Sequence, residues 1–140
     1  MRKLIFILLI VGILTGCAPY CDQKEVETAK TEIDRIYKEY DHWIGNANPD
    51  DPGNQSRIIY YLEDYRKELG SVKVPLCLTA FKLKMLDSMK YQIDAINYLY
   101  SGQTISAKLS MNISQIDIDT ATSIYENIQK CLPNCLPQTP

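Results

Sequence analysis

The chain has 140 residues, of which 46% are hydrophobic, 15 are basic and 17 are acidic. This length is enough for one domain with its own hydrophobic core. The near balance of charge, with no basic stripe, argues against binding to nucleic acid and against attachment to anionic lipid by charge alone.

The first 16 residues have the pattern of a bacterial export signal. Two basic residues precede an apolar run, residues 4–14, which as a helix would rise only about 16 Å and so poorly span a bilayer. A charged start, a short apolar stretch and small residues are typical of a secretory signal. The run ends in a motif that resembles the lipobox of bacterial lipoproteins, Leu14-Thr15-Gly16-Cys17.

The lipobox resemblance implies cleavage before Cys17 and a diacylglyceryl group, with palmitate, on the Cys17 thiol. The mature protein would then be lipid-anchored at the cell membrane or outer membrane, facing the periplasm or the exterior. Ala18, which is not an aspartate, favours the outer membrane in bacteria that have two. An ordinary secretory signal with an incidental cysteine is the alternative.

Two helices are predicted next. The first has apolar residues three or four positions apart on one face: Val26, Ala29, Ile33, Ile36, Tyr40 and Trp43. Residues 45–53 are dense in helix breakers and predict a loop. The second helix ends near Gly70 and repeats the spacing with Ile58, Leu62, Tyr65 and Leu69.

A third helix is predicted to start around Pro75 and to end at Ser101-Gly102. Its apolar face comprises Leu78, Phe81, Met85, Met89, Ile93, Ile96 and Tyr100. Residues 105–114 alternate between apolar and polar, which is a strand pattern and makes 104–118 ambiguous, but a lone strand among helices would have no partner. We therefore favour a fourth helix with a core face of Ile105, Leu109, Ile113, Ile116, Thr120, Ile124 and Ile128.

Four amphipathic helices with short links predict an all-α fold, an up-down-up-down four-helix bundle that follows a cleaved N-terminal signal helix. The predicted boundaries are a signal peptide at 1–16, a lipidated tether at 17–22, the bundle at 23–131 and a proline-rich tail at 132–140.

Besides Cys17, the chain has four cysteines: Cys21, Cys77, Cys131 and Cys135. In the predicted bundle all four lie at one end, and in an exported protein they favour two disulfides over a zinc site. The preferred pairs are Cys77 with Cys131 and Cys21 with Cys135, because the tail can reach the N-terminal segment. We expect this end to face the membrane, since few residues separate it from the lipid.

No residue pattern predicts a catalytic, cofactor-binding or metal site. The single histidine, His42, is expected to help cap a helix end. Asn46, Asn48 and Asp50 have the spacing of the first ligands of a calcium loop, but the later positions fail, so a solvated turn is predicted. The pairs Glu63-Asp64 and Asp117-Asp119 are predicted to lie on exposed helix faces, and Met85 and Met89 to pack in the core.

The segment Pro75-Leu76-Cys77-Leu78, followed on one helix by Ala80, Met89, Ile93 and Tyr100, resembles a group of short helical bacterial lipoproteins. The resemblance covers residues 55–131, implies a helical bundle and assigns no activity; Cys131 and Cys135 are not part of its pattern.

We expect a non-catalytic binding or structural role at the cell-envelope surface, with a membrane anchor and a protein partner. The end of the bundle around residues 46–53 is the expected contact. The alternative is a small-ligand-binding or sensing bundle. An enclosed pocket would favour the ligand-binding role, whereas a filled core with an exposed aromatic patch would favour interaction.

Overall fold

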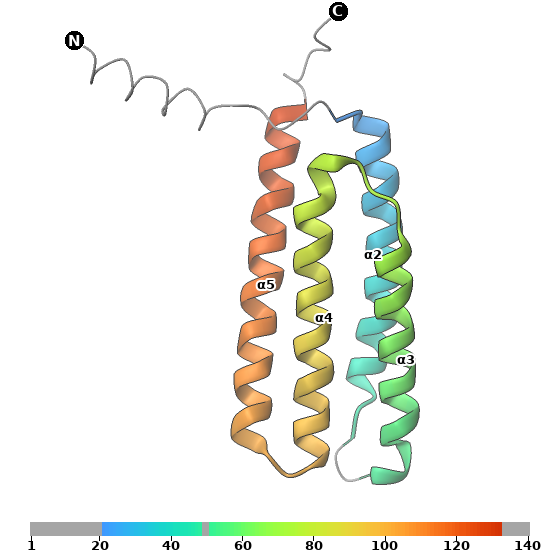
Figure 1. Ribbon diagram of the computed structural model, residues 1–140, viewed down its shortest axis with the longest axis vertical. Coiled ribbons are helices and arrows are strands. Elements are labelled where there is room, and N and C mark those ends of the chain that lie inside the picture. The colour runs from blue at the N-terminus through green and yellow to red at the C-terminus, as the bar shows by residue number, and fades with distance from the viewer. Residues whose placement is uncertain (1–20, 49–50, 133–140) are drawn as a thin grey trace, which may run out of the picture.

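The computed structural model describes residues 21–48 and 51–132, which form four α-helices and one short 3₁₀ turn. In chain order these are α2 (Gln23–Gly45), α3 (Pro52–Ser71), η1 (Leu76–Leu78), α4 (Thr79–Tyr100) and α5 (Thr104–Cys131). Successive helices run in opposite directions, and the described part contains no strand (Figure 1). The predicted all-α four-helix bundle is confirmed, whereas the predicted signal peptide lies outside the described residues.

Helix α2 begins where Asp22 caps it. The Asp22 carboxylate accepts a hydrogen bond from the backbone N–H of Glu25 at 3.0 Å and so satisfies one of the free donors of the first turn. The predicted face is buried, with Trp43 partly buried at its end. The loop to α3 is shorter than predicted, because α2 includes Gly45 and α3 already begins at Pro52.

The core is formed mainly by the facing sides of α2, α3 and α4. Tyr40 of α2 is fully buried there, and its hydroxyl donates to the backbone carbonyl of Met89 at 2.7 Å. Burial raises the pKa of Tyr40, so the phenol stays neutral and remains a donor. Met85 and Met89 pack in this core as predicted.

The connection from α3 to α4 is held by one lysine. The Lys82 ammonium donates to the carbonyls of Gly70 and Val72, at 2.6 and 2.7 Å, and so satisfies two acceptors where α3 ends. At the opposite end of α4, Gly102 has φ +74° in the turn to α5. The predicted end of this helix at Ser101-Gly102 is therefore confirmed.

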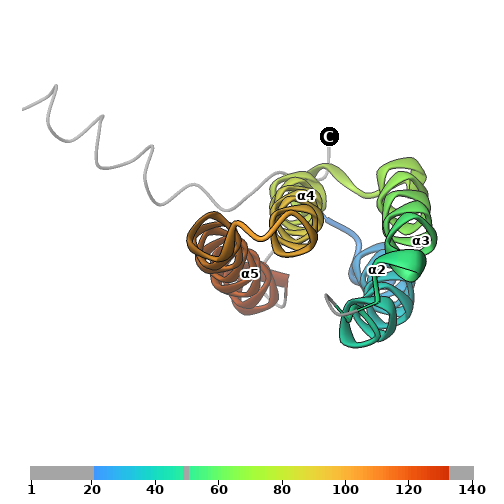
Figure 2. The same ribbon diagram turned by 90° about the horizontal axis from the view of Figure 1, so that it is seen from below.

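The four helices are not arranged as a closed square. Figure 2 shows α4 between α5 on one side and the α2–α3 pair on the other. A described contact between α2 and α5 is made by a long side chain, Lys30, whose Nζ lies 4.8 Å from the centre of the Tyr125 ring. Helix α5 therefore packs principally on α4.

Helix α5 is helical as predicted, but its predicted core face is confirmed only near the C-terminal end, where Ile128 is buried and Ile124 packs against the core. Most of the residues that α5 buries are small. The buried set is Ala107, Ser110, Ser114, Asp117, Ala121 and Ile128. Ile105, Leu109 and Ile116, which were expected in the core, are exposed. Small side chains allow the axes of two helices to approach closely, and this contact decides which side of α5 faces α4.

Polar groups fix the position of α5 along α4. The hydroxyls of Ser88 and Ser114 lie 2.9 Å apart, both fully buried, and the Lys84 ammonium donates to Asp117 at 2.8 Å. This hydrogen bond with Asp117 raises the pKa of Lys84. Asp117 was predicted to be exposed, and its burial in this ion pair corrects that prediction.

Candidate functional site

Three of the four cysteines beyond Cys17 lie at the same end of the bundle. Cys21 precedes α2, Cys77 lies in η1 and Cys131 is the last residue of α5, and Figure 1 places these three segments together. The predicted gathering of cysteines is confirmed for these three, and Cys135 lies outside the described residues.

The cysteine pairing differs from the preferred one. Cys21 and Cys77 form a disulfide with a Cα–Cα distance of 6.3 Å, and the partly buried Cys131 is bonded to neither of these two described cysteines. The predicted pairs Cys77–Cys131 and Cys21–Cys135 are therefore wrong, because Cys21 lies beside η1 at the start of α2. Mass spectrometry of the non-reduced protein should show a peptide pair that links Cys21 to Cys77.

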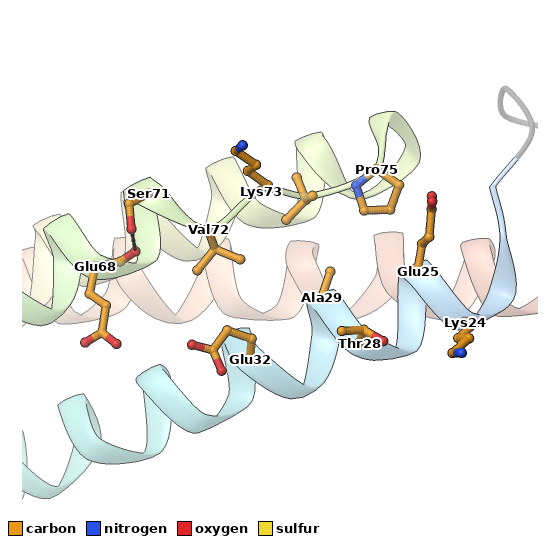
Figure 3. A pocket seen from close by; sticks show the side chains of 11 residues that line it. Lys24, Glu25, Thr28, Ala29, Glu32, Glu68, Ser71, Val72, Lys73 and Pro75 are labelled. Atoms are coloured by element: carbon orange, nitrogen blue, oxygen red, sulfur yellow. Dashed lines mark hydrogen bonds between the residues drawn. The ribbon is translucent and has the colours of Figure 1, made fainter.

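A groove runs beside this disulfide-bonded end. It has a volume of about 800 Å³, is open to solvent, and lies between the first half of α2 and the segment from Glu68 to Pro75 (Figure 3). Ala29 of α2 and Val72 of the facing segment line the groove with apolar side chains. Lys24, Glu25 and Lys73 contribute charges at its edges. The groove is shallow and of mixed polarity, and it is not an enclosed pocket.

One end of the groove carries a charged triad. Arg35 donates two hydrogen bonds to Glu32, at 2.8 and 3.1 Å, and a further one to Glu68 across the helix pair. The hydrogen bond from Arg35 lowers the pKa of Glu32. Because both carboxylates already have a cationic partner, this triad ties α2 to α3 and leaves little free charge for a ligand.

A partly exposed aromatic cluster lies at the other end of α2 and α3, comprising His42, Trp43, Arg57, Tyr60 and Tyr61. The rings of Trp43 and Tyr61 stack with centroids 4.1 Å apart and an interplanar angle of 18°. Tyr60 meets Tyr61 edge-on at 5.6 Å and is 66% exposed. The Arg57 guanidinium lies 5.7 Å from the Trp43 ring centre, so a cation lies close to the stack.

The other polar residues of this end have structural partners. His42 is exposed and contacts Trp43 edge-on, and its carbonyl accepts from the Asn46 side-chain amide at 2.7 Å. Asn46, rather than His42, therefore caps the end of α2. Asp50, the third residue of the calcium-like pattern, lies outside the described residues.

Within residues 21–48 and 51–132, no three His, Cys, Asp or Glu side chains gather as a metal site would require. Among the described helices, none combines the length and apolar character needed to span a bilayer.

The sequence pattern predicts only part of the aromatic cluster. Periodicity places Trp43 on the core face of its helix. It gives no signal for Tyr60 and Tyr61, because their approach to Trp43 depends on how α3 is positioned along α2. The chain matches no known protein family, no curated protein and no solved structure.

Proposed function

We propose that this protein is a lipid-anchored, non-catalytic binding protein of the bacterial cell envelope. The anchor would be a lipid on Cys17, four positions before Cys21, so that the disulfide-bonded end of the bundle faces the membrane. The aromatic cluster would then face away from the membrane, toward a protein partner.

The aromatic cluster is the observation that carries the binding role. Trp, Tyr and Arg are the residue types that contribute most to the energy of protein interfaces, and here they lie together on two adjacent helices. Stacking of Trp43 on Tyr61 holds these rings in place before a partner arrives, which reduces the entropy lost on binding. The aromatic cluster lies at the end of the bundle far from the cysteines, which supports the expectation that this end contacts a partner.

A small-ligand role has weaker support. Ligand sites are usually concave and bury most of the ligand, whereas the groove beside Val72 is open and two of its three carboxylates, Glu32 and Glu68, are paired with Arg35. The interior of the bundle is filled by large side chains. These features favour interaction with a macromolecular surface.

Photo-crosslinking in living cells tests the proposed contact. A benzoylphenylalanine placed at position 60 of the full chain should give a discrete protein adduct on irradiation, because the Tyr60 side chain of the cluster is 66% exposed. The same probe at the exposed Lys90 of α4 is the matched control and should give no such adduct. Adding Trp43→Ser to the position-60 probe should remove the adduct, since the stacked platform is lost.

An identical adduct pattern at positions 60 and 90, or an adduct from position 60 that survives Trp43→Ser, would contradict the proposal. The variant remains testable because Trp43 lies at the edge of the core, and circular dichroism reports whether the helices are retained.

A further inference from the structure

Helix α5 carries an exposed apolar stripe formed by Ile105, Leu109 and Ile116, which are 86%, 60% and 63% exposed. Their spacing of four and seven residues places them on one face of the helix, with Ile113 and Thr120 partly buried beside them. The stripe lies on the side of α5 opposite its contact with α4, which is made by Ala107, Ser110 and the other buried residues of α5. Large aliphatic side chains in a line on a helix are typical of a surface that packs against another helix.

The charges beside the stripe are sparse and opposite. Lys108 is the only charged residue between Thr104 and Ile116, and Asp119 is the next charged residue on the same side of the stripe. Lys108 and Asp119 are eleven positions apart, close to three full turns, so they lie on one line parallel to the stripe. When two helices pack antiparallel, corresponding flanks of the two helices face each other.

We propose that the stripe binds a second copy of this chain, with the two α5 helices antiparallel about an axis near Ile113. In this register Leu109 lies beside Ile116 of the second copy, and Ile105 lies beside its Thr120. Lys108 comes level with Asp119 of the second copy, to within about one residue's rise of 1.5 Å. Both the apolar and the charged parts of the surface are therefore complementary to themselves, as a two-fold contact requires.

The antiparallel register follows from the charges. A parallel pairing would set the flank that carries Lys108 and Asp119 against the opposite flank of the second copy, so these two charges would not face each other. The antiparallel pairing brings the corresponding flanks together and so forms two attractive pairs. The contact is short, so we expect a dimer with micromolar affinity.

The pairing leaves the aromatic cluster on α2 and α3 available, so it does not depend on the proposed function. It also sets the Cys21 ends of the two copies at opposite ends of the dimer. If both copies carry the proposed lipid, they would meet from two facing membrane surfaces.

Sedimentation equilibrium of the full chain in density-matched detergent tests the dimer. We expect a monomer–dimer equilibrium below about 100 μM, and Leu109→Glu should raise the dissociation constant by about tenfold or more. Leu83→Glu is the matched control, because Leu83 of α4 is 55% exposed and is not on the stripe; it should leave the constant unchanged. A chain that stays monomeric throughout, or a dimer insensitive to Leu109→Glu, would overturn the proposal.

A charge exchange tests the antiparallel register. Lys108→Asp alone should weaken the dimer, and combining it with Asp119→Lys should restore the original constant, because the opposite charges face each other again. Failure of the double variant to recover would overturn the antiparallel arrangement. All of these positions are exposed, so circular dichroism should show unchanged helix content.

Discussion

Replacing both Cys21 and Cys77 by serine is expected to lower the free energy of unfolding by about 4 kcal/mol. The disulfide joins residues 56 positions apart, and closing a loop of that length removes much of the conformational entropy of the unfolded chain. A loss of this size is comparable to the whole stability of many small domains, so the variant should melt far below the wild type. Thermal denaturation followed by circular dichroism measures the effect.

Cys131→Ser is the matched control for this prediction. Cys131 lies at the same end of the bundle outside the Cys21–Cys77 disulfide, and its replacement should change stability by less than about 1 kcal/mol. If Cys131→Ser lowered the melting temperature as much as the double variant, the disulfide between Cys21 and Cys77 would not be the stabilising one. Such a result would return the pairing of Cys77 with Cys131 to consideration.

Ser114→Leu is expected to destabilise the protein by about 3 kcal/mol, because it places a large side chain where two helices approach closely. Ser114 is 1% exposed and faces Ser88 at hydrogen-bond distance, so no free volume is available for the extra atoms. Urea denaturation at low protein concentration, where dimer formation contributes little, measures the change in the free energy of unfolding.

Ile116→Ser is the matched comparison on the same helix, two residues further on. Its side chain is mostly exposed, so the loss should stay below about 1 kcal/mol. The face of α5 predicted from hydrophobicity alone gives the opposite order, with Ile116 in the core and Ser114 outside. A large loss for Ile116→Ser with tolerance of Ser114→Leu would contradict the observed packing of α5.

The burial of Ser114 and the exposure of Ile116 show what hydrophobic periodicity alone does not determine. In α2, α3 and α4 most of the predicted apolar face is buried, so periodicity alone identified the core from Val26 to Ile96, with Trp43 and Tyr65 partly buried at its edge. Helix α5 has two parallel lines, one of large aliphatic and one of small residues. Hydrophobicity favours the line of Ile105, but close approach to α4 favours the line of Ala107, and only the three-dimensional packing decides between them.

The cysteine pairing and the aromatic cluster likewise depend on details that a periodic pattern does not describe. The topology predicted that the cysteines would meet at one end, because it depends only on the order and direction of the helices. The pairing of Cys21 with Cys77 depends on the path of a few residues before α2, which no periodic pattern describes. Likewise, the Trp43–Tyr61 stack requires the register between two helices, which hydrophobic spacing leaves open.

The proposed location is tested most directly by labelling cells that express the full chain with radioactive palmitate. The wild type and Cys131→Ser should both incorporate the label, since Cys131 is far along the chain from the lipobox-like motif, whereas Cys17→Ser should not. Label in the first two chains and none in the third would support a lipid on Cys17. A wild-type chain that takes up no palmitate would contradict the anchored arrangement.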